Sequence, residues 1–329
     1  KVSSGFLQDL RTEEYGLFRK KGVMRYVWLL FGWMVWTGCS QKNIEMPEEG
    51  RFSLQLATAE ASRFEDYIHS LNVYAFRKTA EETFVYAATL AELEAADIAA
   101  LADGSERGNS KILPIDLAVG TYAVYAVGNA AGFLRGSLTE DLTRPEDLFI
   151  YGPENGEDSI YFLGHTVAQM VTEFMSPVPI ELNRAVSKLI LVLYGVPGQV
   201  KTVDMTLGNL AQGINLAGGL TPESKTITRS YPVKPLNGAE KDTLSGAVVT
   251  LPSLGKGATM RLSFYAEDGE EVSKEMPLQT LLPDKYVRVA GHIDDKPGAL
   301  LSFEVKFRLI MYDYWLDRDL PDFVLESKE

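Results

Sequence analysis

The sequence predicts an all-β protein with minor helices, built as two tandem β-sandwich domains. Apolar and polar residues alternate in many short segments, which is the period-two pattern of half-buried strands. Turns that contain Pro or Gly separate these segments, at a spacing that favours sandwiches over a βαβ layout. The 329 residues suffice for two domains that each bury a hydrophobic core.

The first half contains three predicted strands with apolar residues at alternate positions. These positions are Phe52, Leu54 and Leu56, then Leu71, Val73 and Ala75, then Tyr122, Val124 and Ala126. Two helices are expected among the strands. Residues 91–102 are rich in Ala, Glu and Leu, and Gly104 follows as a stop signal. Residues 167–175 are the second helical candidate.

The second half contains five predicted strands. They cover residues 188–196, 247–251, 259–266, 285–293 and 302–314. Between the halves, Pro177 and Pro179 interrupt periodic structure, because proline lacks a backbone donor and restricts the residue before it. We therefore expect one domain at residues 51–176 and a second at residues 177–318, followed by an acidic tail at residues 319–329.

A signal segment is predicted before Cys39, the single cysteine of the chain. Four basic residues precede an apolar run at residues 26–35, and Trp36, Thr37 and Gly38 follow it. A basic region, a short apolar region and a small residue before the cleavage site are typical of an exported protein. The run has about ten residues, whereas a membrane-spanning helix needs roughly 20. A buried helix with an incidental cysteine is the alternative, but the run has no polar face.

Cys39 is the expected lipid acceptor, with signal cleavage between Gly38 and Cys39. Residues 1–38 are then a leader, and residues 39–50 form a linker to the first strand. Whether residues 1–23 are upstream material or part of this leader stays open. One cysteine also means that the chain has no internal disulfide.

The chain after the leader is strongly acidic. Residues 1–38 hold six Lys/Arg and three Asp/Glu, which leaves 26 basic and 42 acidic residues and a formal net charge of −16. Such a surface repels nucleic acid and anionic lipid head groups, so a lipid on Cys39 must hold the protein at a membrane. The acidic clusters at residues 294–295 and 317–319 lack the spacing of a calcium loop and are expected to be solvated.

The sequence contains no recognisable catalytic, metal-binding or cofactor-binding motif. His69, His165 and His292 are far apart and have none of the spacings of a zinc site. Residues 255–257, Gly-Lys-Gly, lack the first glycine and the hydroxyl residue of a phosphate-binding loop, and they predict a turn. A serine-nucleophile elbow and a dinucleotide fingerprint are also missing. We therefore expect neither an enzyme nor a bound cofactor.

A surface lipoprotein that binds glycans is the alternative function. Tyr151, Tyr161, Tyr231 and Trp315 are the candidates for an aromatic platform under a sugar. Aromatic residues of a β protein more often pack in the core or along a sheet edge, which favours the other interpretation.

Three segments carry a resemblance to a known family. The first is the lipoprotein-like start that ends at Cys39, with a short polar linker and the strand at residues 51–56 after it. The second joins LNVYAF at residues 71–76 with GTYAVYAVGN at residues 120–129, and the third is LNRAVSKL at residues 182–189. Together they resemble the FimB-type fimbrial anchor family of Bacteroidetes, within the fimbrillin superfamily, over essentially all of the mature chain.

This resemblance implies two transthyretin-like sandwiches and a lipid-anchored protein of the cell outer membrane at the base of a surface fimbria. The implied function is to anchor the fimbria and limit its length through strand-mediated contact with the major stalk subunit, since exposed strand edges accept strands from other chains. Stalk relatives lose an N-terminal strand to an arginine-specific protease. Arg51 and Arg63 are the candidate cleavage points here, and an anchor is expected to resist cleavage at both.

The C-terminal segment also bears on assembly. Residues 316–329 contain Pro321 and three aspartates, which make a poor alternating strand. A subunit that ends the polymer fits this composition better than one in the middle of a stalk. An acidic tail without structure is the alternative.

Overall fold

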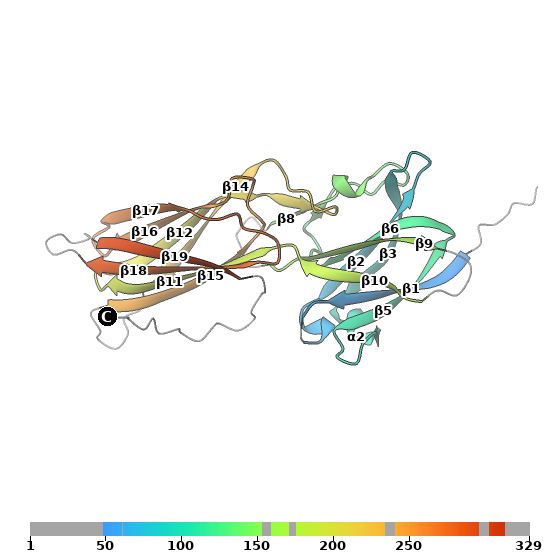
Figure 1. Cartoon of the computed structure of the whole chain (residues 1–329), viewed down its shortest axis with the longest axis horizontal. Coiled ribbons are helices and arrows are strands. Elements are labelled where there is room, and N and C mark those ends of the chain that lie inside the picture. Colours follow the sequence, from blue (N-terminus) through green and yellow to red (C-terminus); the bar gives the residue numbers. More distant parts are fainter. Residues whose placement is uncertain are drawn as a thin grey trace, which may run out of the picture. The chain divides into compact units, whose positions relative to one another are not determined.

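The computed structural model describes residues 49–60, 62–152, 159–170, 176–233, 241–295 and 303–312 (Figure 1). In these residues, nineteen strands form four sheets, with one short α-helix and two 3-10 helices. Each of the eight predicted strands lies on an observed strand, so the expected all-β class and the sandwich-like arrangement of sheets are confirmed. The predicted leader, Gly38, Cys39 and the tail at residues 319–329 lie outside the described residues.

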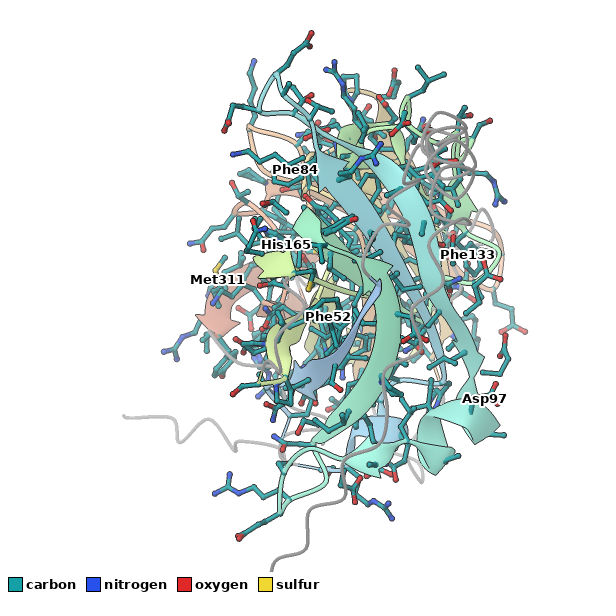
Figure 2. The ribbon with its side chains drawn as sticks, turned by 90° about the vertical axis from the view of Figure 1, so that its right-hand side faces the viewer. Phe52, Phe84, Asp97, Phe133, His165 and Met311 are labelled. Carbon is teal, nitrogen blue, oxygen red and sulfur yellow. The ribbon has the colours of Figure 1, made fainter. Side chains whose placement is uncertain are left out.

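The first half is an eight-stranded sheet that curls around one core. Its strand order is β3 (Phe84–Glu94), β2 (Ser70–Lys78), β6 (Gly120–Gly128), β9 (Phe162–Met170), β10 (Val178–Arg184), β1 (Glu49–Thr58), β5 (Ser110–Ala118) and β4 (Ala102–Asp103). Buried side chains from β1 and β5 share a single hydrophobic cluster with those of β2 and β6, although β9 and β10 separate the two pairs in the sheet. Figure 2 shows Phe52 of β1 among the curled strands.

The two strands β2 and β6 are buried on both faces. Their other side chains, among them Phe76 and Tyr125, pack in edge-to-face geometry at 5.4 Å between ring centroids. A small sheet covers this face, formed by β7 (Leu134–Arg135), β8 (Phe149–Tyr151) and β13 (Gly213–Asn215). Ile214 and Leu251 from the second half of the chain belong to the same cluster. The run YAVYAV in β6 agrees with this burial, because a strand covered on both sides needs no polar face.

The second half consists of two four-stranded sheets. One contains β15 (Lys241–Thr250), β11 (Ser187–Pro197), β18 (Tyr286–Asp295) and β19 (Phe303–Tyr312), in that order. The other contains β14 (Ser224–Pro232), β12 (Val200–Ala211), β16 (Thr259–Ala266) and β17 (Glu271–Pro277). Side chains from both sheets form one hydrophobic core, as expected for a sandwich.

Both helix predictions were wrong in part. Residues 91–94 extend β3, where Ala91 pairs with Val73 and Leu93 with Leu71, so only α2 (Ala95–Ala100) is helical (Figure 2). Residues 167–170 belong to β9 and pair with β6, while residues 171–175 lie outside the described part. In both cases pairing with a central strand outweighs the helix propensity of Ala, Glu and Met, which amounts to less than about 1 kcal/mol per residue.

The strand β10 begins directly after Pro177, the first of the two prolines that marked the expected boundary, and contains the second. It pairs in parallel with β1 and antiparallel with β9, so the first sheet extends to Arg184. The domain limits remain a prediction, and strand pairing leads us to propose a border between Arg184 and Ser187. Pro179 lies within β10, where it occupies the position opposite Gln55 of β1.

Candidate functional site: the first strand and its junction

The strand β1 is the first described element after the predicted lipid site, and it lies inside a sheet. It pairs antiparallel with β5 from Glu49 to Ala57 and in parallel with β10 from Leu54 to Thr58. A strand bonded on both sides has no free edge. Removing β1 would therefore expose the backbone groups of two neighbouring strands.

Side chains of β1 also form part of the core. Phe52 is 4% exposed, and Leu54 and Leu56 are fully buried. Burying each such side chain stabilises the folded protein by about 1.5–3 kcal/mol. The alternation that predicted this strand thus places three apolar residues inside the first sandwich.

Polar contacts hold the C-terminal end of β1. The Thr58 N–H donates to the Asn109 carbonyl at 3.1 Å, and Asn109 Nδ2 donates back to the Thr58 carbonyl at 3.3 Å. Gln55 Nε2 donates to the Gly104 carbonyl at 3.0 Å. A Cβ on Gly104 would lie 2.8 Å from Ser110 Oγ, so a larger residue would displace that side chain where the turn meets the sheet.

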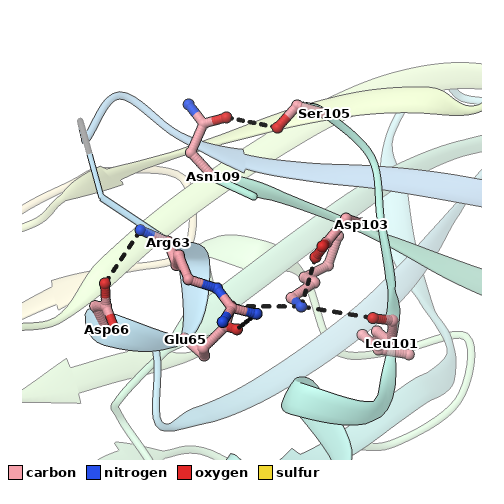
Figure 3. A network of polar contacts seen from close by, with 8 residues as sticks. Arg63, Glu65, Asp66, Leu101, Asp103, Ser105 and Asn109 are labelled. Atoms are coloured by element: carbon pink, nitrogen blue, oxygen red, sulfur yellow. Dashed lines mark hydrogen bonds and ion pairs between the residues drawn. The ribbon is translucent and has the colours of Figure 1, made fainter. Parts of the chain in front are cut away.

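A buried lysine of β5 lies beside this end of β1 and pairs with Asp103, which Figure 3 labels. Lys111 is 1% exposed and occupies the β5 position opposite Leu56. Its Nζ atom donates to Asp103 Oδ1 at 2.7 Å and lies 3.4 Å from Glu65 Oε2. The hydrogen bond and charge of Lys111 hold the pKa of Asp103 below its usual value. Two carboxylates therefore compensate a charge that would otherwise be costly to bury.

The candidate cleavage point Arg63 lies in a folded turn. Its guanidinium pairs with Glu65, and its backbone N–H donates to Asp66 Oδ2 at 3.1 Å (Figure 3). Phe64 is fully buried, and its N–H donates to the Gly108 carbonyl at 2.8 Å. The peptide bond between Arg63 and Phe64 is thus fixed on both sides. The other candidate, Arg51, lies in β1 opposite Asp116.

Arg184 joins the segment after β1 to the second sandwich. It is 3% exposed at the end of β10, and its guanidinium pairs with Glu60 and lies 3.7 Å from Asp284. The same guanidinium lies 5.7 Å from the ring centroids of Tyr67 and of Phe162, within the range of a cation–π interaction. Burial raises the pKa of Asp284, and the charge of Arg184 opposes that shift.

Backbone contacts continue this junction. Asp284 directly precedes the lysine before β18, and its N–H donates to the Val186 carbonyl at 2.9 Å. Ser187 Oγ donates to the Leu282 carbonyl at 2.6 Å. The segment LNRAVSKL is therefore the connection between the two halves, a role that strand periodicity alone did not reveal.

Asn129, the last residue of the segment GTYAVYAVGN, has a structural role. It adopts φ of 59°, a left-handed conformation that asparagine tolerates better than most residues. Its Oδ1 accepts from the N–H of His69 at 2.7 Å, and its Nδ2 donates to the Tyr67 carbonyl at 2.7 Å. Asn129 thus fixes the chain that leads from η1 (Phe64–Asp66) into β2.

The tyrosines of the predicted sugar platform have other roles. Tyr161 is 1% exposed in the core shared by β2 and β6, and the Tyr231 hydroxyl donates to the Ala247 carbonyl at 3.0 Å. Tyr151 lies in β8, and Trp315 is outside the described residues. Because Tyr161 is buried and Tyr231 packs against the second core, these two rings do not form an exposed platform.

The remaining candidates lie apart from one another. His165 stacks on Tyr125 at 5.2 Å between ring centroids, and His292 Nε2 lies 3.5 Å from Asp294 Oδ1. In the part of the chain that the structure describes, no three His, Cys, Asp or Glu side chains gather as a metal site. Gly257 has φ of 87°, and its N–H donates to the Leu254 carbonyl, which confirms the predicted turn. No helix among the described residues is long and apolar enough to cross a membrane.

Comparisons with known proteins agree with this architecture. The model of the family described as fimbrillin-A associated anchor proteins Mfa1 and Mfa2 matches residues 43–305. The fimbrial anchor protein Mfa2 from Porphyromonas gingivalis shares the fold with a TM-score of 0.51 and 14% identity, over 80% of this chain and 98% of that chain. No curated protein matches the chain by sequence.

Two further solved structures are similar. A candidate adhesin from Bacteroides thetaiotaomicron gives a TM-score of 0.56 at 14% identity, over 81% of this chain and 97% of that chain. A candidate adhesin from Bacteroides ovatus gives a TM-score of 0.51 at 15% identity, over 79% of this chain and 95% of that chain. At these identities the solved structures show a shared fold.

Proposed function

This chain belongs to the fimbrillin-A associated anchor proteins, and we propose that it anchors a fimbria to the cell outer membrane through a lipid on Cys39. The family gives it a fimbria-associated role at the cell surface. In our proposal, cleavage between Gly38 and Cys39 frees the residue that receives the lipid. Contact with a strand of the major stalk subunit then holds the fimbria, and the anchor, as the last subunit, limits its length.

The observation that supports this proposal most strongly is the interior position of β1. The chain after Cys39 leads within ten residues to this strand, which is bonded to β5 and β10 and contributes three side chains to the core. A lipid attached to Cys39 would therefore be linked to the whole first sheet rather than to a loose terminus.

The same position gives a reason for the chain to resist arginine-specific cleavage. A cut after Arg63 would separate all of β1 from the body, and a cut after Arg51 would separate its first three residues. Either cut would break the covalent link between the body and its lipid. Proteases cleave segments that open locally to an extended conformation. The buried Phe64 and the hydrogen bond from its N–H to Gly108 oppose such opening at Arg63.

The decisive experiment compares fimbriated cells that lack the protein with cells that carry its Cys39→Ala variant. Deletion is expected to release fimbriae into the medium and to change their length. Cys39→Ala is expected to remove the protein from the membrane fraction, whereas the neighbouring Ser40→Ala variant, the matched control, should remain there. Fimbriae that stay attached and unchanged after deletion would exclude the anchoring role. Membrane retention of Cys39→Ala would exclude the lipid.

Resistance to processing has its own test. The folded full-length chain is incubated with an arginine-specific protease beside heat-unfolded chain, and fragments are identified by mass spectrometry. We expect cuts after Arg51 and Arg63 only in the unfolded sample. A Phe64→Ala variant should become sensitive at Arg63 under native conditions. Rapid cleavage of the folded native chain at either arginine would contradict the proposal.

A further inference from the structure

The two sides of the second sandwich differ in how they are closed. On one side, the ring of Tyr231 in β14 lies against Gly246 in β15, where an added Cβ would come within 2.4 Å of that ring. The Tyr231 hydroxyl donates to the Ala247 carbonyl. The β15 side chains on this side, Leu244 and Val248, are 5% and 0% exposed. We call this side the closed seam.

The opposite side, between β17 and β19, is only partly covered. Its core-facing apolar side chains are all half-buried: Val272, Met276, Val305, Phe307, Leu309 and Met311. On the adjacent strand β18, Val287, Val289 and Ile293 are 0–1% exposed. On this side, the core-facing side chains of the two edge strands, β17 and β19, are therefore partly accessible to solvent. We call this side the open seam.

Edge strands usually carry a feature that prevents a foreign strand from adding, such as a proline, a bulge or an inward-pointing charge. The strand β3 has two shifts of register against β2, and β5, which β4 covers only at Lys111 and Ile112, contains Pro114. Two inward-facing cations protect other edges, since Arg229 of β14 lies opposite Met205 and Lys274 of β17 opposite Leu262. The closed seam covers β15.

The strand β19 has none of these features. Its register with β18 runs without a shift from Phe303 to Tyr312, and it contains no proline. Its core-facing positions are all apolar, because Val305, Phe307 and Leu309 lie opposite Ile293, Gly291 and Val289. In the described part of the chain, β18 is the one strand that pairs with β19. This edge therefore combines a regular strand of ten residues with an accessible apolar face.

We propose that the open seam, along the outer edge of β19, receives the extended strand through which the stalk subunit is held. The inference rests on the anchoring function proposed above and identifies the surface that performs it. Backbone groups of β19 supply the ladder, and apolar side chains at every second position of the incoming strand fill the space beside Phe307 and Leu309. Exposed Arg308 on the outer face favours an acidic residue at a position between them.

The chain's own C-terminal residues are a weaker occupant. Residues 316–329 contain Pro321 and three aspartates, which interrupt an alternating apolar pattern. Proline cannot donate to a ladder. A strand from another subunit has no such limit.

Photocrosslinking in fimbriated cells tests the contact. The full-length chain carries p-benzoylphenylalanine in place of Arg308, and the matched control carries it in place of Ser245, an exposed residue of β15 at the closed seam. We expect crosslinks from position 308 to an alternating apolar segment of the stalk subunit, and few from position 245. Equal crosslinking from both positions, or crosslinks from 308 to residues 313–329 of the same chain, would overturn the proposal.

A pair of substitutions on β19 tests the apolar face. Leu309→Gln places an amide in the open seam, while Ile310→Gln makes the same change one residue later, on the opposite face of the strand. Losing one buried apolar side chain from the contact predicts about tenfold weaker retention of fimbriae under shear for Leu309→Gln. The Ile310→Gln variant should retain them, and thermal unfolding must show that both variants fold.

The outcomes separate this inference from the anchoring function. If deletion of the protein releases fimbriae but Leu309→Gln retains them and position 308 gives no stalk crosslink, anchoring stands and the open seam is not the contact. If deletion leaves fimbriae attached, the anchoring function fails whatever the crosslinks show.

Discussion

The terminal strands of the two sandwiches differ in their position in the sheet and in their burial. In the first, the initial strand β1 lies between β5 and β10, and Leu54 and Leu56 are fully buried. In the second, the final described strand β19 lies at a sheet edge, and its core-facing side chains are half-buried. The described strand nearest Cys39 in the sequence is integrated into the body, whereas the described strand farthest from it in the sequence remains accessible. This difference agrees with the proposed role as a link between a membrane and a polymer.

The largest expected effect tests the integration of β1. Leu54→Ala removes a fully buried side chain and should lower the free energy of unfolding by about 2–5 kcal/mol. Leu309→Ala, on the half-buried face of β19, should cost clearly less because its site is already partly hydrated. Urea unfolding of both variants measures the difference. Equal losses would mean that the two strands are equally integrated.

Arg184 tests whether the halves are coupled through the junction. Arg184→Met leaves Glu60, which is 14% exposed, without this partner and removes the charge near Asp284. We expect a loss of about 2–4 kcal/mol, at the lower end of values for a broken buried pair because the Asp284 side chain is 38% exposed. Arg261→Met, at a half-exposed ion pair with Glu271, is the control and should change stability little. Equal effects in calorimetry would refute a coupling role.

Tyr231 tests the closed seam on a smaller scale. Tyr231→Phe keeps the ring over Gly246 and removes the hydrogen bond to the Ala247 carbonyl. The expected loss is about 0.5–1.5 kcal/mol in chemical denaturation, with an unchanged fold. If Tyr231→Phe instead made β15 accessible to the crosslinker at position 245, the hydroxyl rather than the ring would be what closes the seam.

The smallest effect concerns pH. Lys111 lowers the pKa of Asp103 from the ordinary value of 3.8. The stability from this shift is present above pH 3.8, and it is lost as pH falls through the lower folded-state pKa. Asp103→Asn should therefore flatten the acid side of the stability curve slightly. If the free energy of unfolding changed with pH below 4 in the same way for the native protein and for Asp103→Asn, this assignment would be contradicted.

Sequence periodicity predicted the class of the fold and the strands whose side chains alternate cleanly. It missed β3 as a strand at residues 91–94, because Ala and Glu favour a helix locally and only the pairing with β2 decides otherwise. Periodicity also did not show that Pro179 lies inside a strand that pairs with β1, and the domain boundary expected near Pro177 and Pro179 stays a prediction. Local signals do not report partners more than a hundred residues away in the chain.

The contacts at the junction were harder to predict from the sequence than the strands. Arg184, Glu60 and Asp284 come from three distant segments, and no spacing in the sequence connects them. The segment LNRAVSKL drew attention by resemblance, but its physical role depends on a burial that only the folded chain reveals. The open seam is a similar case, since the alternation of β19 resembles that of any other strand.

The pairing of β1 has a mechanical consequence. Hydrogen bonds between antiparallel strands run perpendicular to the strand direction, and those to β10 slant across the opposite edge. A pull along β1 from its N-terminal end therefore loads many of these bonds together, whereas a pull across the sheet would break them one by one. A strand held on both edges would withstand the tension of a fimbria dragged by flow far better than its length alone suggests.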